Sequence, residues 1–170
     1  ALFLAMAGLQ PLLIERGQPI EQRQLDVARF WKNGELNPES NIQFGEGGAG
    51  TFSDGKLTTG IKDPFCRAVL EELVLAGAPD DLLYVAKPHV GTDLLRAAMV
   101  GLRRKILAYG GEIRYGCRLT GLDLASGQLR TIQLKEKDHS AEVTVDQLIL
   151  ATGHSARDVF TLLNDLNVPL

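Results

Sequence analysis

The segment 41–59, which reads NIQFGEGGAGTFSDGKLTT, constrains the fold of this chain more than any other. Glycine adopts backbone conformations that other residues avoid, and it lets the main chain approach a ligand closely. Successive backbone N–H groups in such a loop can form a concavity that holds an anion. The glycines of the segment are Gly45, Gly47, Gly48, Gly50 and Gly55.

Polar side chains in the same segment favour phosphate as that anion. Thr51 and Thr58 supply hydroxyl groups, and Lys56 supplies a positive charge. The alternative is a flexible glycine linker, but linkers seldom carry aromatic residues such as Phe44 and Phe52. We therefore interpret the segment as a phosphate-binding loop.

The composition is typical of a globular protein. Of the 170 residues, 45% are hydrophobic and 23% are charged, and the formal net charge is -3. No run of basic residues is longer than residues 103–105, so we expect no nucleic acid as a partner. No apolar run is long enough to cross a bilayer, so we expect no membrane association.

The cysteines and the first residues of the chain bear on its compartment. Cys66 and Cys117 are far apart and lack metal-ligand spacing, which fits two unpaired, buried thiols and no metal site. The start, ALFLAMAGL, resembles a signal-peptide core, but it has no initiator methionine and no basic leader. We interpret it as part of a helix inside a domain, and we expect a cytoplasmic protein.

Hydrophobic periodicity predicts helices in the first two thirds of the chain. We expect them at residues 1–8, 20–32, 65–76 and 93–109, each followed by a glycine that can end it. Thr92 is the expected N-cap of the last of these helices. The residues expected on the apolar faces of the third and fourth helices are Phe65, Val69, Leu73 and Ala76, and Leu95, Met99, Leu102 and Ile106.

The remaining apolar segments read as strands. Residues 11–14 and 148–151 are short continuous apolar runs, as expected of buried parallel strands. Between them, from residue 112 to 145, apolar residues alternate with polar ones and predict a three-stranded meander. Its turns are expected at 126–127 and 135–139, with His139 exposed. The order indicates an α/β fold in which the meander crosses over between two parallel strands.

Glu15 stands at the carboxyl end of the first predicted parallel strand. In a dinucleotide-binding fold, an acidic residue at such a position accepts hydrogen bonds from the ribose hydroxyls of adenosine. The alternative is a charged residue that merely ends a strand. The first interpretation depends on a G-x-G-x-x-G turn before Ala1, and that turn is not in this sequence.

Longer strings resemble a known family. ALFLAMAGL followed by LLIERG looks like the helix and second strand of FAD-binding Rossmann domains in flavoproteins with two dinucleotide-binding domains. Three further strings resemble the bacterial NAD(FAD)-utilising, FAD-dependent dehydrogenases, and the likeness covers nearly the whole chain. These strings are SNIQFGEGGAGTFSDGKLTT, KPHVGTDLL and ATGHSARD.

The resemblance implies a set of FAD contacts. Glu15 would hold the adenosine ribose, with Arg16 beside it near the adenine. Arg118 and Leu119 would meet the adenine through backbone groups. Thr152 and Gly153 would approach the cofactor at the end of the last parallel strand. The residues implied to line the diphosphate or the flavin edge are Gly47, Gly48, Ala49, Gly50 and Thr51.

The chain departs from the family pattern at two places. The dinucleotide fingerprint upstream and the later glycine-aspartate segment that holds the ribitol are both absent from the sequence. We therefore expect residues 1–170 to be a partial FAD-binding domain, a fragment of a flavoprotein. Residues 54–93 are expected to be an insertion towards a substrate domain.

The histidines are the candidates for proton transfer, because histidine titrates near neutrality. His89 lies in a Pro-His-Val-Gly-Thr turn, and His154 directly follows Thr152 and Gly153. Each could equally be a turn residue bonded to the backbone, so the catalytic residues stay open. Asp158 is expected in the opening turn of a helix, with an ion pair there.

The resemblance implies an FAD-dependent dehydrogenase in which NADH or NADPH reduces the flavin and a small molecule is the substrate. The protein would position the flavin, and the flavin would carry out the redox chemistry. One alternative is an FAD-binding module of an RNA-modifying or redox-responsive protein, although the chain lacks the basic surface that RNA favours. Another is a truncated flavoprotein with no activity of its own.

Overall fold

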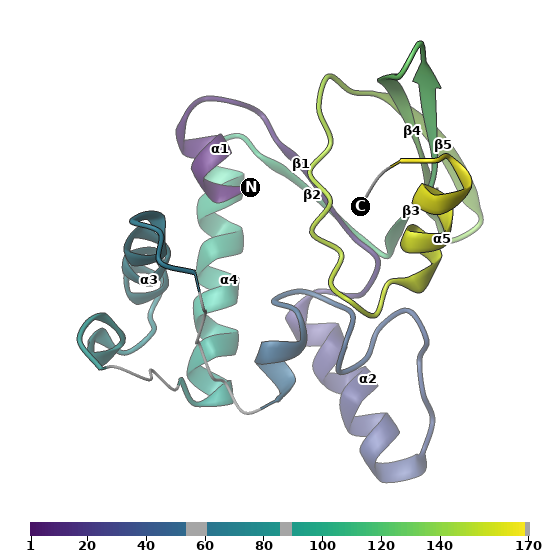
Figure 1. Cartoon of the computed structure of the whole chain (residues 1–170). Helices are drawn as coiled ribbons and strands as arrows, with labels where there is room; N and C mark the ends of the chain where they lie inside the picture. Colours follow the sequence, from purple (N-terminus) through teal and green to yellow (C-terminus); the bar gives the residue numbers. More distant parts are fainter. Residues whose placement is uncertain (54–60, 86–89, 169–170) are drawn as a thin grey trace. The chain divides into compact units, whose positions relative to one another are not determined.

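The computed structural model describes residues 1–53, 61–85 and 90–168. The chain divides into two compact units, Ala1–Tyr115 and Gly116–Leu170, and each is described by itself (Figure 1). Four residues of the sequence argument, Gly55, Lys56, Thr58 and His89, lie outside the described residues. The α/β class is confirmed, because one unit contains a parallel strand pair and the other a three-stranded antiparallel sheet.

The sheet of the first unit is formed by β1 (Leu12–Glu15) and β2 (Glu112–Tyr115), which are parallel. Glu15 and Tyr115 are register partners at the carboxyl ends of the two strands. The expected burial of the first strand is wrong, because Leu13 is 38% exposed. Each strand of a two-stranded sheet is an edge strand, whereas the buried parallel strands of larger sheets have neighbours and covering layers on all sides.

Helices surround these strands. The short α1 (Leu2–Met6) contacts the long α4 (Thr92–Ala108), and α2 (Ile20–Asn33) ends at Gly34, which has a φ of 74°. Gly34 thus forms the left-handed C-cap that the sequence predicts. Thr92 is the first helical residue of α4 and not its N-cap, because Gly91 occupies that position and no side chain caps the helix.

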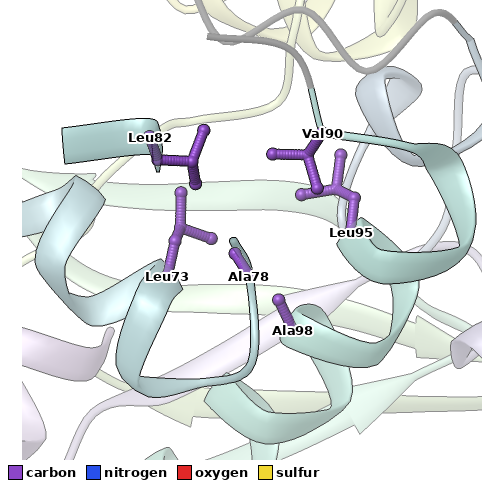
Figure 2. Close-up of a cluster of buried hydrophobic side chains, with 6 residues drawn as sticks. All are labelled: Leu73, Ala78, Leu82, Val90, Leu95 and Ala98. Atoms are coloured by element: carbon purple, nitrogen blue, oxygen red, sulfur yellow. The ribbon is translucent and has the colours of Figure 1, made fainter. Parts of the chain in front are cut away.

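The main apolar core of the first unit lies between α3 (Phe65–Leu75), the short 3-10 helix η2 (Asp80–Leu83) and α4. Figure 2 shows its buried side chains pointing toward one another. The expected apolar face of α4 is confirmed, but that of α3 is wrong at Phe65 and Val69, which are exposed. The six residues of this core are Leu73, Ala78, Leu82, Val90, Leu95 and Ala98.

The second unit contains the predicted meander, with strands β3 (Cys117–Ala125), β4 (Gln128–Glu136) and β5 (His139–Thr144) in that order. The helix α5 (Arg157–Asp165) contacts β3. His139 is exposed, as expected. The buried hydrophobic residues of this unit are Cys117, Ile132, Leu134, Ala156, Val159 and Leu163.

Two strand predictions are wrong. Residues 112–115 belong to β2 rather than to the meander, because Gly116, with a φ of 62°, separates β2 from β3. Residues 148–151 are not a strand, and Ile149 is 71% exposed. A strand needs a neighbour for its N–H and C=O groups, and none of the strands β3–β5 pairs with this segment. The parallel partner of β1 is therefore β2, so the predicted crossover between 11–14 and 148–151 is wrong too.

Both cysteines lie among the described residues, and they form no disulfide. Cys117 is buried, whereas Cys66 is half-exposed, so the expected burial is correct for one thiol only. Among the helices of the described residues, none is both long enough and apolar enough to span a membrane.

The core between α3 and α4 allows a first prediction about stability. Leu82 is 2% exposed and Leu75 is 74% exposed. In the full-length protein, Leu82→Ala should lower the free energy of unfolding by about 2–5 kcal/mol, because it removes buried methyl groups and leaves a cavity. Leu75→Ala is the control and should change it by less than about 0.5 kcal/mol. Urea titration measures both, and equal effects would contradict the position of this core.

Candidate functional site

The glycine-rich segment folds around the side chain of Arg23, which projects from α2 and is fully buried. Its guanidinium donates hydrogen bonds almost entirely to backbone carbonyl oxygens. Nε donates to Asn41 O at 2.9 Å, and Nη2 donates to Ile42 O at 3.0 Å. The acceptors of Nη1 are the carbonyl oxygens of Gly45, Glu46 and Gly48 at 3.2, 2.6 and 2.8 Å and Thr51 Oγ1 at 2.9 Å.

An aromatic ring completes the environment of this guanidinium. The ring of Phe52 lies between two arginines, with the guanidinium carbons of Arg23 and Arg96 each 4.4 Å from its centroid. Arg96 also donates from Nε to Thr51 O at 3.2 Å. Burial lowers the pKa of Arg23 to about 10. That value is still far above neutrality, so a positive charge lies inside the loop at pH 7.

Glu15 holds the start of the loop from the end of β1. Its Oε1 accepts hydrogen bonds from the backbone N–H of Gly17 at 2.7 Å and of Gly45 at 3.0 Å. The two glycine backbones approach so closely that a Cβ on Gly17 would lie 2.5 Å from Gly45 Cα. The other oxygen, Oε2, accepts no hydrogen bond from the residues that the structure describes.

Glu46, the next residue of the loop, is buried and joins three further segments. Its Oε2 accepts hydrogen bonds from Ile20 N at 2.9 Å and from Arg103 Nη1 at 3.0 Å, and its Oε1 accepts from the Tyr115 hydroxyl at 2.7 Å. Arg103 forms a second ion pair with Glu21. The loop is thereby tied to the start of α2, to α4 and to the end of β2.

These contacts shift three pKa values. Burial, followed by the hydrogen bond to Glu46, raises the pKa of the Tyr115 hydroxyl, so the phenol stays protonated. The hydrogen bond to Glu21 raises the pKa of Arg103, and the same bond lowers the pKa of Glu21. The Arg103–Glu21 ion pair is therefore fully charged at neutral pH.

The outer rim of the loop is exposed backbone. Gly47, Gly48 and Ala49 are exposed, and Ala49 begins a 3-10 helix, η1 (Ala49–Phe52). Gly47 and Gly48 have φ values of 82° and 68°, whereas Gly50 has no positive φ. A Cβ on Gly48 or on Gly50 would meet no atom of the described residues within 4 Å. This backbone is accessible to a ligand.

Two of the predicted contact residues have other partners in the structure. Thr51 is fully buried, and its hydroxyl donates to Gly48 O at 2.8 Å. Arg16 lies with its guanidinium 4.5 Å from the centroid of the Phe44 ring, and its Nε lies 3.5 Å from Glu39 Oε2. Their roles at a cofactor stay predictions.

The other predicted contacts belong to the second unit. Arg118 forms an ion pair with Asp158 at 3.9 Å, and Asp158 lies in the first turn of α5 as expected. Thr152 and Gly153 are exposed, and Gly153 has a φ of 71°. The roles implied for Arg118, Leu119, Thr152 and Gly153 stay predictions. His154 is exposed, and its Nε2 lies 3.4 Å from Ser155 Oγ.

Four residues that organise the loop were not predicted from the sequence, namely Arg23, Glu46, Arg103 and Tyr115. Arg23 carries a signal, because it is three residues after Ile20 and four before Val27, on the face of α2 that these two bury. A charged residue on a buried helix face needs partners. Across residues 1–53, 61–85 and 90–168, no group of three or more His, Cys, Asp or Glu side chains is placed to hold a metal.

Comparison with protein-family models found no match. An uncharacterised protein of Clostridium beijerinckii is 46% identical over 170 residues, and the alignment covers all of this chain and 31% of that protein. The chain therefore spans 31% of the length of the curated relative it matches.

The crystal structure of Thermovibrio ammonificans THI4 is similar with a TM-score of 0.61 and 15% sequence identity. The match covers 99% of this chain and 58% of that chain. This likeness concerns the fold alone, and it supports an α/β fold.

Arg103 pairs with two carboxylates, those of Glu46 and Glu21, and replacing each in turn gives a matched pair of variants. In Glu46→Gln the half-buried Arg103 loses its buried counter-charge but keeps Glu21, so the free energy of unfolding should fall by about 1.5–3 kcal/mol, the net contribution of a hydrogen bond to a charged group. Glu21→Gln removes the partner whose side chain is 60% exposed, and it should cost no more than about 1 kcal/mol. Denaturant titration of both full-length variants at pH 7 is the measurement. A larger effect of Glu21→Gln would show that Glu46 is not the central partner.

Proposed function

We propose that this chain contributes the adenosine-binding and diphosphate-binding part of an FAD-dependent oxidoreductase. The observation that carries the proposal is the geometry of Glu15 at the carboxyl end of a parallel strand. One carboxylate oxygen anchors the glycine loop, and the other accepts no hydrogen bond from the described residues. An acceptor at this position suits a ribose hydroxyl.

The residues of the first unit fit the adenosine diphosphate part of FAD. Glu15 Oε2 would accept a hydrogen bond from a ribose hydroxyl, and the exposed backbone of Gly47, Gly48 and Ala49 would approach the diphosphate. The absence of a side chain on Gly48 leaves open space in front of the main chain. The charges of Arg23 and Arg96, close behind the loop, favour an anion in front of it.

The bound flavin would supply the redox chemistry, as cofactors do in such enzymes. We propose NADH or NADPH as the reductant and a small molecule as the substrate, both on the resemblance of the sequence strings. The role of this chain would be to bind the cofactor and to orient it. Glu15 would fix the adenosine end, and the loop would fix the diphosphate.

Purification of the full-length protein tests the proposal. We expect a yellow protein whose chromophore is released on denaturation and is identified as FAD by chromatography and mass spectrometry. The holoprotein should oxidise NADH or NADPH in the presence of an electron acceptor. A colourless protein that takes up no added FAD would refute the proposal, and an FAD-bound protein without NAD(P)H oxidation would refute only the proposed reductant.

Glu15→Gln isolates the contribution of the free oxygen. The amide oxygen of glutamine can still accept from Gly17 and Gly45, while its NH₂ group replaces the free acceptor. The affinity for FAD should fall by roughly ten- to a hundredfold, equivalent to the loss of one charge-assisted hydrogen bond of about 1.5–3 kcal/mol. Fluorescence titration of the apoprotein with FAD measures it.

Glu35→Gln is the matched control for this substitution. Glu35 is exposed and accepts a hydrogen bond only from Asn33 Nδ2 among the described residues, so the affinity should not change. The melting temperature of the apoprotein shows whether Glu15→Gln has kept the anchor to the loop. Unchanged affinity in Glu15→Gln would remove Glu15 from the site.

A further inference from the structure

Three carbonyl groups of the glycine loop point toward Arg23. Its Nη1 donates to the carbonyl oxygens of Gly45, Glu46 and Gly48. In a trans peptide the C=O of one residue and the N–H of the next point in opposite directions. The N–H groups of Gly47 and Ala49 are therefore directed away from the guanidinium.

The same two N–H groups are unoccupied on the outer rim. Gly47 and Ala49 are exposed. No residue in the described part of the chain accepts a hydrogen bond from either N–H, whereas Glu46 N donates to Gln18 O and Gly48 N donates to Gly45 O. The carbonyl oxygens of Gly45, Glu46 and Gly48 thus face Arg23, while the N–H groups of Gly47 and Ala49 are directed away from it.

We propose that Arg23 is a positioning residue that sets this polarity and so makes the rim a binding surface for a diphosphate. The inference rests on the proposed function, and it adds a buried residue that touches no ligand. Backbone N–H groups bind phosphate oxygens when they converge outward. If the carbonyls turned outward instead, their negative ends would repel the same anion.

Arginine can hold the carbonyl groups of the loop in this orientation better than lysine can. A guanidinium presents five N–H donors in a fixed plane, and the contacts to Asn41, Ile42 and Gly45 come from three different nitrogen atoms. A lysine ammonium has three donors at one point and cannot reach the same set of carbonyls. Arg23→Lys keeps the charge, so it separates the orienting role from the charge alone.

The test compares ADP with adenosine as ligands of the full-length apoprotein. Both would use Glu15, but only ADP would use the loop N–H groups. In Arg23→Lys we expect the affinity for ADP to fall at least tenfold, and that for adenosine to fall less than threefold, by isothermal titration. In the unsubstituted protein, ADP should also shift the amide resonances of Gly47 and Ala49.

Arg29→Lys is the matched control. Arg29 lies on the exposed face of the same helix, and its side chain forms no hydrogen bond or ion pair with the described residues. Both affinities should stay unchanged. If Arg23→Lys does not fold, Thr51→Val replaces it, because it removes one acceptor of Nη1 and the hydroxyl that holds Gly48 O. ADP binding should then weaken about threefold more than adenosine binding.

The outcomes separate this inference from the proposed function. Equal loss of ADP and adenosine binding in Arg23→Lys, or an unchanged ratio in Thr51→Val, would overturn the positioning role and leave the proposed function in place. An unsubstituted protein that binds adenosine and ADP equally would overturn the positioning role together with the diphosphate part of the proposed function, and it would leave only the adenosine part in place. An unsubstituted protein that binds neither ADP nor FAD would overturn both.

Discussion

The structure of the first unit depends on the buried positive charge of Arg23, which needs hydrogen-bond acceptors. An unpaired guanidinium in a protein interior costs several kcal/mol, so the chain around Arg23 must supply acceptors. It does so mainly with backbone carbonyls from residues 41–48. Such acceptors are available only if the chain wraps closely around the side chain. The irregular path of the loop is therefore a consequence of one arginine on α2.

Two further anchors make this loop an extension of the parallel strands. Glu15 and Tyr115 are neighbours at the ends of β1 and β2. Glu15 accepts the N–H of Gly45, and Tyr115 donates to the carboxylate of Glu46. Two consecutive loop residues, Gly45 and Glu46, are thus held by the ends of the two neighbouring strands β1 and β2. In open α/β sheets, ligands bind beyond the carboxyl ends of the strands, which is where this loop is fixed.

Local signals predicted much of the fold. The helices before Gly34 and Gly110 and the three-stranded meander follow from periodicity and turn residues within one short window. The prediction of strand pairing failed where the pairing depends on residues that are distant in the sequence. The apolar run at 148–151 looks like a strand, but hydrophobicity carries no information on whether a neighbour exists. The four residues 112–115 looked like the start of the meander, because their alternation continues into β3 without a break.

The candidate site shows a similar limit, because glycines that look alike in the sequence are present for different reasons. A Cβ on Gly45 would lie 2.3 Å from Arg23 Cδ, and one on Gly47 would lie 2.4 Å from Thr51 Cγ2. At these two positions any side chain would clash with side chains of the protein itself, so glycine is required by internal packing. A Cβ on Gly48 or Gly50 would contact none of the residues that the structure describes, and Gly50 has an ordinary φ.

Neither packing nor backbone conformation within the described residues explains a glycine at position 50. The absence of a side chain there is explained if something outside the described chain approaches the backbone. Gly50 follows directly on Ala49, whose N–H is directed outward by the contact of Gly48 O with Arg23. The position that packing of the described residues leaves unexplained therefore lies next to the surface at which we propose that an anion binds.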